Sequence, residues 1–452
     1  MRTAVEEPTL RPSLRANGRA FAQISQFHPE LTSFRRDLHA NPELGFEEIY
    51  TSGRVKQALE LCGVDEIYTG IGKTGVVGVI HGRGKDAKHG KHAKNDMSSY
   101  DNDSCLRNID GHQGSFSAPI SMLGLRADMD ALPMTEHNAF GWKSTKPGLM
   151  HGCGHDGHTT MLVGAARYLA ETRNFSGSAV LIFQPGEEGF AGAKAMIDDG
   201  LFERFPVHSA YAMHNWPGMP PGTVGINPGP MMAAADRITI TITGKGGHGA
   251  HAYMTVDPVL VAGHIITAVQ SIVSRNVKPV DNAVISLCAM QAGDLAAMSV
   301  VPGTATLVGT VRTFSPTVQA LLERRLNELC SGVAQAFGAT ASVHYQRIYP
   351  ATINTPAEAG FAGDVAASIV GEARVKRDME PSMGAEDFSF MLQAKPGAYM
   401  RIGQGDGGAA GGMGQPGCFL HNSQYDFNDE VLPLGAALFA GLVEQAMPLG
   451  AQ

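Results

Sequence analysis

The sequence predicts an α/β protein of two domains, in which a smaller ferredoxin-like unit interrupts a larger domain built on a mixed sheet. The chain has 452 residues, which is too many for a single hydrophobic core. Strands and helices alternate between about residues 120 and 214, and a β-α-β-β-α-β order fills 236–349. We therefore expect segments 1–235 and 350–452 to form one domain, with 236–349 inserted between them.

Composition and charge exclude several classes of protein. Hydrophobic residues make up 43% and charged residues 17% of the chain, which is typical of a globular protein. A net charge of -8 argues against nucleic acid or an anionic membrane as a partner. The six cysteines lack C-x-x-C spacing, so neither a disulfide framework nor a zinc ribbon is expected. We find neither a signal peptide nor a long uncharged apolar stretch, and expect a cytoplasmic protein.

The first 120 residues give fewer signals. Residues 1–29 lack clean periodicity and predict an extended or frayed lead-in. Helices are expected over Glu30–His39 and Glu47–Cys62, followed by a strand over Gly75–Ile80. The segment 83–117 is polar and almost without aliphatic residues, which predicts a surface insertion loop.

The rest of the chain has regular patterns. Strands separated by helices predict parallel pairing with right-handed crossovers. The elements expected in the large domain are strand Ser121–Ala127, helix His158–Thr172, strand Ala179–Phe183, helix Ala191–Asp199 and strand Ser209–Met213. Those expected in the inserted unit are strand Arg237–Thr243, helix Asp257–Arg275, strands Ala283–Met290 and Thr304–Arg312, helix Thr317–Phe337 and strand Ala341–Arg347. A Gly-rich loop is expected at 403–417.

One motif suggests a nucleotide-binding oxidoreductase but lacks the required context. Gly70, Gly72 and Gly75 have the G-x-G-x-x-G spacing of a dinucleotide-binding turn. That turn must be followed by a helix whose N-terminus binds phosphate. Here Val76 and Val77 predict a strand instead, so we reject this function.

Metal-binding residue types follow several of the expected strands. In an open parallel sheet, functional groups gather beyond the carboxyl ends of the strands. The residues found there are Asp128, Asp130, His151, Cys153, His155, Asp156, His158, Glu187, Glu188 and His214. Taken singly, each has an ordinary explanation, such as a buried thiol or a solvated turn. Together they favour a site for Zn, Mn, Co or Ni over one for Mg or Ca, which prefer oxygen ligands alone.

Six motifs follow one another along the chain: RADMDALPM (126–134), HGCGHDGHTTMLVGAA (151–166), FQPGEEG (183–189), AMHNWPG (212–218), GKGGHGAH (244–251) and MGAEDFSF (383–390). They resemble those of the metal-dependent amidohydrolases of the aminoacylase/carboxypeptidase type, particularly the branch of hippurate hydrolase and the plant indole-acetyl-amino-acid hydrolases. The resemblance covers nearly the whole chain from about residue 30. It implies that the inserted unit is a lid and dimerisation domain, so that the protein is a homodimer.

The resemblance also implies roles for individual residues. Two divalent ions per subunit would be held by Cys153, His155, Glu188, His214 and His421. The other implied roles are Asp130 orienting a ligand, Glu187 as general base, His248 steadying the oxyanion in a neighbouring subunit, and Arg312, Ser299 and Asn215 binding substrate. A guanidinium fork matches the geometry of a substrate carboxylate. Ser299 stands where the family usually has Asn.

These features predict metal-dependent hydrolysis of the amide bond of N-acyl amino acids, of the hippurate or N-acetyl type. Within enzymes, the alternative is a carboxypeptidase or dipeptidase that cleaves short peptides. A non-catalytic metal-binding homologue is a third possibility. The intact general base Glu187 argues against it, because a binding protein has no need of that residue.

Overall fold

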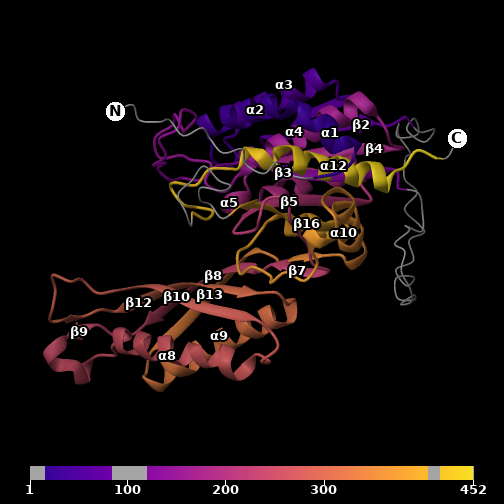
Figure 1. The fold of residues 1–452 in the computed structure, drawn as a ribbon. Coiled ribbons are helices and arrows are strands. Elements are labelled where there is room, and N and C mark those ends of the chain that lie inside the picture. Colours follow the sequence, from indigo (N-terminus) through magenta and orange to yellow (C-terminus); the bar gives the residue numbers. More distant parts are fainter. Residues whose placement is uncertain (1–15, 84–119, 406–417, 451–452) are drawn as a thin grey trace, which may run out of the picture. The chain divides into compact units, whose positions relative to one another are not determined.

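The computed structural model describes residues 16–83, 120–405 and 418–450. By its internal contacts the chain divides into two compact units (Figure 1). The larger unit comprises the chain up to Gly229, Asn354–Met379 and the chain from Met391; the smaller comprises Pro230–Ile353 and Glu380–Phe390. The expected insertion loop at 83–117, apart from Arg83, and most of the Gly-rich loop at 403–417 lie outside the described residues.

An eight-stranded sheet forms the centre of the larger unit, in the order β1-β2-β4-β3-β5-β16-β6-β15. Its strands are β1 (Glu66–Ile71), β2 (Gly75–His81), β3 (Met122–Asp128), β4 (Ser178–Gln184), β5 (Ser209–Pro217), β6 (Val224–Gly225), β15 (Val375–Lys376) and β16 (Gly397–Gly405). The four central strands, β4, β3, β5 and β16, run parallel, as the alternating pattern predicts. Because β1 and β2 join antiparallel at one side, the sheet is mixed. The predicted fold class is confirmed.

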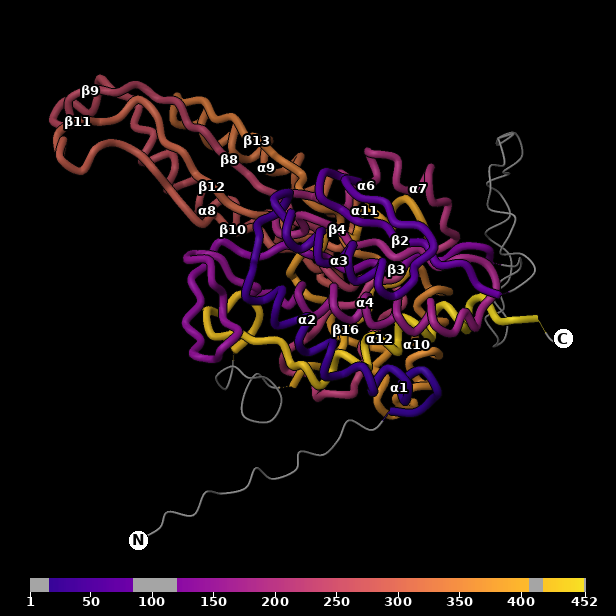
Figure 2. Tube along the Cα trace, turned by 90° about the horizontal axis from the view of Figure 1, so that it is seen from above, coloured from indigo at the N-terminus to yellow at the C-terminus, as the bar shows by residue number. Residues whose placement is uncertain are grey.

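Helices cover the sheet and bury its apolar strands. They are α1 (Arg19–Ile24), α2 (His28–Ala40), α3 (Ile49–Cys62), α4 (His155–Thr172), α5 (Glu187–Phe190), α6 (Gly192–Asp198), α7 (Leu201–Arg204), α10 (Pro356–Val370) and α12 (Leu432–Ala446). Helix α4 packs between α2 and α12, and both views show these three helices side by side (Figures 1 and 2). Its Gly164 permits the close approach, because a Cβ there would lie 3.0 Å from Ala436 and 3.2 Å from Leu31.

Two expectations for this unit are wrong in detail. Residues 19–27 are helical rather than extended, as α1 and the 3-10 helix η1 (Ser25–Phe27). Ile24 and Phe27 anchor this segment in the core, which is a tertiary effect that periodicity over so few residues does not reveal. Helix α4 begins at His155 rather than His158, because Gly154 takes the left-handed conformation (φ 98°) and starts the helix one turn earlier.

The smaller unit is an antiparallel four-stranded sheet in the order β10-β12-β8-β13, with two helices packed on it. Its elements are β8 (Ala234–Thr243), β9 (Gly247–His248), η3 (Gly249–Met254), α8 (Pro258–Asn276), β10 (Ala283–Ala292), β11 (Val300–Val301), β12 (Thr304–Thr313), α9 (Pro316–Ala336) and β13 (Thr340–Tyr349). The main strands and helices follow the expected β-α-β-β-α-β order. The remaining short elements of the chain are β7 (Gly229–Met232), β14 (Thr352–Asn354), η4 (Glu372–Arg374), α11 (Phe388–Ala394) and η5 (Asp429–Val431).

Helix α8 is the one described helix that is long and apolar enough to cross a membrane, judged by length and composition alone. The helix is amphipathic, and Val261, Ile265, Val269 and Ile272 lie fully buried in the core of the smaller unit. This packing accounts for its apolar character.

Candidate metal centre

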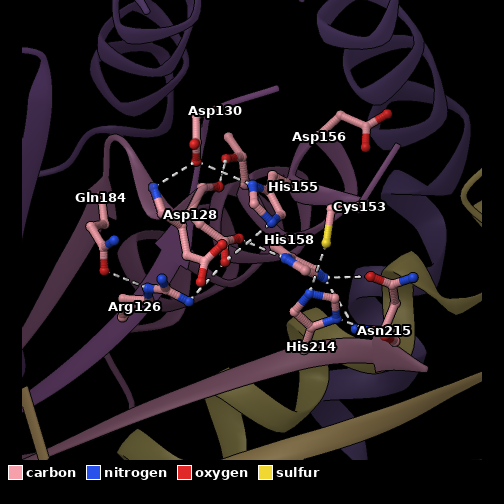
Figure 3. Close-up of polar contacts among 12 residues, drawn as sticks. Arg126, Asp128, Asp130, Cys153, His155, Asp156, His158, Gln184, His214 and Asn215 are labelled. Atoms are coloured by element: carbon pink, nitrogen blue, oxygen red, sulfur yellow. Dashed lines mark hydrogen bonds and ion pairs between the residues drawn. The ribbon is translucent and has the colours of Figure 1, made fainter. Parts of the chain in front are cut away.

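The carboxyl ends of β3 and β4 and the polar end of β5 bring the predicted side chains to one edge of the large sheet (Figure 3). Asp128 ends β3, and Asp130 follows two residues later. Glu187 and Glu188 follow β4, while His214 lies within β5. The N-terminal turn of α4 adds imidazoles to the same place. Parallel pairing, which aligns strand ends, therefore assembles the cluster.

Asp130 is buried and binds three donors around the site. Its Oδ1 accepts the backbone N–H of Glu187 at 3.0 Å, and its Oδ2 accepts that of Glu188 at 2.9 Å. The Nδ1–H of His155 donates to Oδ1 at 3.2 Å. One carboxylate thus holds the two acidic residues and an imidazole in a fixed relation.

Asp128 and His158 form a second polar pair, whose contribution the sequence analysis missed. Asp128 accepts from Arg126 at 2.8 Å and from the His158 Nδ1 at 2.6 Å. Burial alone would raise the pKa of Asp128, but the charges of Arg126, His155 and His158 hold it well below its usual range. His155 and His158, at i and i+3, lie on the same face of α4. The i, i+3 spacing of these two histidines was the signal in the sequence that could have shown that His158 lies near the site.

Asn215, expected to bind substrate, lies fully buried among these groups. Its Oδ1 lies 2.7 Å from the Nε2 of His158, and its Nδ2 donates to the Tyr425 hydroxyl at 2.6 Å and to Gln404. In the structure, the Asn215 side-chain amide therefore holds the His158 ring in position.

Asp156 points away from the cluster (Figure 3). Its carboxylate accepts from the His39 ring at 2.8 Å and forms an ion pair with the buried Arg35 at 3.5 Å. The sequence placed Asp156 among the metal-binding residue types near the strand ends, but not among the five expected ligands. Its contacts instead tie α4 to α2.

The five residues expected as ligands form two overlapping groups that could hold a metal. The possible ligand atoms of Cys153, His155 and His214 lie within 4.8 Å of one another, and so do those of Cys153, Glu188 and His421. Cys153 Sγ is 3.3 Å from His214 Nε2, and His421 Nε2 is 3.1 Å from Glu188 Oε1. The five residues proposed as ligands from the sequence thus share one locality.

The hydrogen bonds of the two imidazoles leave ligand atoms facing this locality. His214 donates from Nδ1 to the Asn215 carbonyl at 2.7 Å, so its Nε2, which lies against Cys153 Sγ, carries the lone pair that can bind a metal. His155 donates from Nδ1 to Asp130, and its buried Nε2 has no hydrogen-bond partner among the described residues. That atom is 3.7 Å from Asp128 Oδ2 and 4.0 Å from Glu188 Oε1. A buried nitrogen that faces carboxylates without hydrogen bonding to them is consistent with a cation site between these groups.

The electrostatics of the cluster agree with this reading. Burial, followed by the charges of Glu188 and Glu187, raises the pKa of the Cys153 thiol well above its usual value. Burial alone would lower the pKa of His155, but the negative charges of Asp128 and Asp130 outweigh burial and raise this pKa to about 10. Carboxylates that favour a proton on the ring equally favour a metal cation beside it. The residues present therefore fit a divalent metal.

Glu187 is buried next to these atoms. Its carboxylate lies within 4.8 Å of the possible ligand atoms of His155 and Glu188. Gly186 precedes it in the left-handed conformation (φ 58°), and Gly189 follows in the same region (φ 89°). Such a turn places an acid beside the metal-binding atoms.

The remaining predicted residues lie in the smaller unit and are not gathered at one point within it. His248 on β9 is exposed and pairs with Val300, next to Ser299, whose carbonyl accepts from Gly249 at 2.7 Å. Arg312 is half-buried near the far end of β12, where it donates to the Thr310 hydroxyl at 2.6 Å. About 27 Å of strand separates Arg312 from the end of β12 nearest His248, since each residue of a strand spans about 3.4 Å.

Comparison with known proteins agrees with the geometry. Residues 124–445 match peptidase family M20/M25/M40. Hippurate hydrolase of Campylobacter jejuni is 38% identical, over 93% of this chain and 97% of the relative. An IAA-amino acid hydrolase of Arabidopsis thaliana, ILR1-like 4, is 35% identical, over 93% of this chain and 86% of the relative.

A solved structure is also similar to this chain. The YXEP protein of Bacillus subtilis, described as a dinuclear metal binding peptidase from the M20 family, is similar with a TM-score of 0.73 and 29% identity, covering 94% of this chain and 99% of that one. The resemblance inferred from the motifs is confirmed. The chain therefore belongs to peptidase family M20/M25/M40 and is a metallo-amidohydrolase, an enzyme that acts on amide bonds.

Proposed function

We propose that this enzyme hydrolyses the amide bond of N-acyl amino acids and releases a carboxylic acid and a free amino acid. The observation that carries the proposal is the buried Glu187 carboxylate beside a cluster of thiol, imidazole and carboxylate ligands. The substrate class is supported by the names of the relatives, a hippurate hydrolase and an IAA-amino acid hydrolase, each of which matches nearly the whole chain.

The metal centre would hold two divalent ions, with Zn, Mn, Co or Ni as candidates because the ligands mix sulfur, nitrogen and oxygen. The proposed ligands are Cys153, His155, Glu188, His214 and His421. A divalent ion held by these residues would lower the pKa of water to about 7 and would polarise the substrate carbonyl.

Glu187 would act as general base, taking a proton from the attacking water and returning it to the leaving amine. Asp130 supports this role because it holds the backbone of Glu187 and the ring of His155 together. Arg312 would bind the substrate carboxylate with its planar fork, and His248 would donate to the oxyanion.

We propose that the active enzyme is a homodimer in which each substrate contacts Arg312 of one subunit and His248 of the other. A small N-acyl amino acid spans roughly 10 Å. About 27 Å of strand separates Arg312 from the part of the smaller unit that carries His248 and Ser299, well beyond the length of such a substrate, which favours supply of these residues by two subunits. His248 and Ser299 of one chain would then serve the substrate held by Arg312 of the other.

The cytoplasm is proposed as the place of action. The five cysteines among the described residues are all free thiols. Free thiols persist in a reducing compartment.

Amine release from a panel of substrates tests the proposal. The reduced protein, loaded with Mn or Zn, is assayed on hippurate, N-acetyl amino acids and dipeptides, with and without a chelator. We expect the N-acyl amino acids to be cleaved and the chelator to stop the reaction. Cleavage of dipeptides alone would establish the carboxypeptidase or dipeptidase alternative. No release by protein with bound metal would instead indicate a homologue that only binds.

A further inference from the structure

Glu48 is a fully buried carboxylate that none of the roles above uses. It lies directly before α3, and its two oxygens bind two segments that are distant in sequence. Oε1 accepts the backbone N–H of Gly186 at 2.8 Å, and Oε2 accepts the hydroxyl of Thr74 at 2.5 Å. Gly186 is the residue immediately before Glu187, so Glu48 contacts the backbone that carries the general base.

The turn that carries Glu187 is held by two carboxylates together. Three successive backbone N–H groups, those of Gly186, Glu187 and Glu188, donate to Glu48 and to Asp130. The same turn contains Ala191 with a positive φ of 57°, a left-handed conformation that a non-glycine residue adopts at an energetic cost. Such a backbone persists only where its surroundings fix it.

The loop before Glu48 adds close packing to these hydrogen bonds. A Cβ on Gly45 would lie 2.5 Å from the Phe190 ring and 2.9 Å from the Cα of Gly186, so only glycine fits there. Phe46 packs edge-on against Phe190 with 5.8 Å between ring centroids. The carbonyl of Glu43 accepts the N–H of Ala131 at 2.8 Å, next to Asp130. The loop 43–48 thus contacts both segments that set the position of Glu187.

We propose that Glu48 is a positioning residue for the reaction, which fixes the Glu187 carboxylate through the Gly186 amide without touching substrate. The inference rests on the proposed function, because it takes Glu187 as the general base. Either charge state of Glu48 can accept from Gly186. Burial raises the pKa of Glu48 to about 7, so both states occur near neutral pH.

Two substitutions separate the hydrogen bond from mere filling of space. Glu48→Gln keeps an oxygen for Gly186, whereas Glu48→Leu keeps the volume and removes the acceptor. We expect Glu48→Leu to lower kcat about 100-fold, the scale expected for a small misplacement of a catalytic group. KM should change less than about threefold, and metal content should be unchanged. Glu48→Gln should stay within about threefold of the wild type. Loss of kcat in the Gln variant equal to that in the Leu variant would overturn the proposal, and so would full activity of the Leu variant.

A matched control uses another buried glutamate of the same unit. Glu358 on α10 is buried, and burial raises its pKa too, so Glu358→Leu tests the general cost of the substitution. We expect this variant to keep the wild-type kcat. If Glu48→Leu does not fold, Gly45→Ala takes its place, because its Cβ would displace Gly186 and should lower kcat in the same way. A Gly45→Ala enzyme with wild-type kcat would then count against the proposal.

Hydrogen exchange separates this inference from the proposed function. In Glu48→Leu the amides of residues 186–188 should exchange faster than in the wild type, while in Glu48→Gln they should not. This readout does not need turnover. Unchanged exchange in the Leu variant would refute the positioning role even if the enzyme acts on another substrate, whereas absence of amine release by the wild type would refute only the substrate class.

Discussion

Asp130→Asn changes the carboxylate that connects the proposed general base, Glu187, with a proposed ligand, His155. The new amide oxygen can still accept from the N–H of Glu187 and from His155. The amide nitrogen then faces the N–H of Glu188, where Asp130 Oδ2 accepted at 2.9 Å, so two donors oppose each other. Leaving one buried N–H unsatisfied costs about 1–3 kcal/mol of unfolding free energy. Loss of an orienting partner typically lowers metal affinity about 10–100-fold.

The assay has two parts. Urea unfolding of metal-free protein measures the change in stability, and competition with a chelator measures metal affinity. Asp199→Asn is the control, because Asp199 also accepts a backbone N–H, that of Gly72 at 3.0 Å, but is exposed and lies outside the site. We expect it to change stability by less than about 0.5 kcal/mol. Wild-type stability and metal affinity in Asp130→Asn would refute the role given to this carboxylate.

Three further outcomes follow. Burial would lower the pKa of His39, but the hydrogen bond to Asp156 helps to raise it to about 9. The stabilisation that protonated His39 contributes to the folded state is therefore complete below pH 6.5 and is lost as the pH rises through 9. The free energy of unfolding should fall by about 3 kcal/mol over that window. A His39→Gln variant with the same decline would contradict this. Mixing His248→Ala with Glu187→Gln chains should restore about a quarter of wild-type activity if subunits share sites, and none if they do not. Arg312→Lys should raise KM about tenfold with little change in kcat, and unchanged KM would exclude it as the carboxylate anchor.

Residue patterns predicted the framework of the site, because strand ends in a parallel sheet can be located from periodicity. Asp128, Glu187 and His214 could therefore be assigned to one edge of the sheet before any coordinates. The start of α4 was placed three residues late, since Gly154 begins the helix through its backbone conformation and leaves no side-chain capping signal.

Contacts between distant segments could not be inferred in this way. Glu48 and Gly186 are 138 positions apart, and only the folded chain brings them into hydrogen-bond distance. The same holds for the pairing of Asp128 with His158 and for that of Asp156 with His39. Sequence spacing identifies which chemistry is present, whereas tertiary packing decides which group each side chain serves.

Turnover of hippurate by wild type and Glu187→Gln, measured together with metal content, tests the central claim most directly. The account predicts two divalent ions per chain in both proteins. It also predicts glycine release by the wild type that a chelator abolishes, and a rate at least about 100-fold lower in the variant. Substantial release by the metal-loaded Glu187→Gln protein would contradict the assignment of the general base, and release that survives removal of the metal would contradict the metal centre itself.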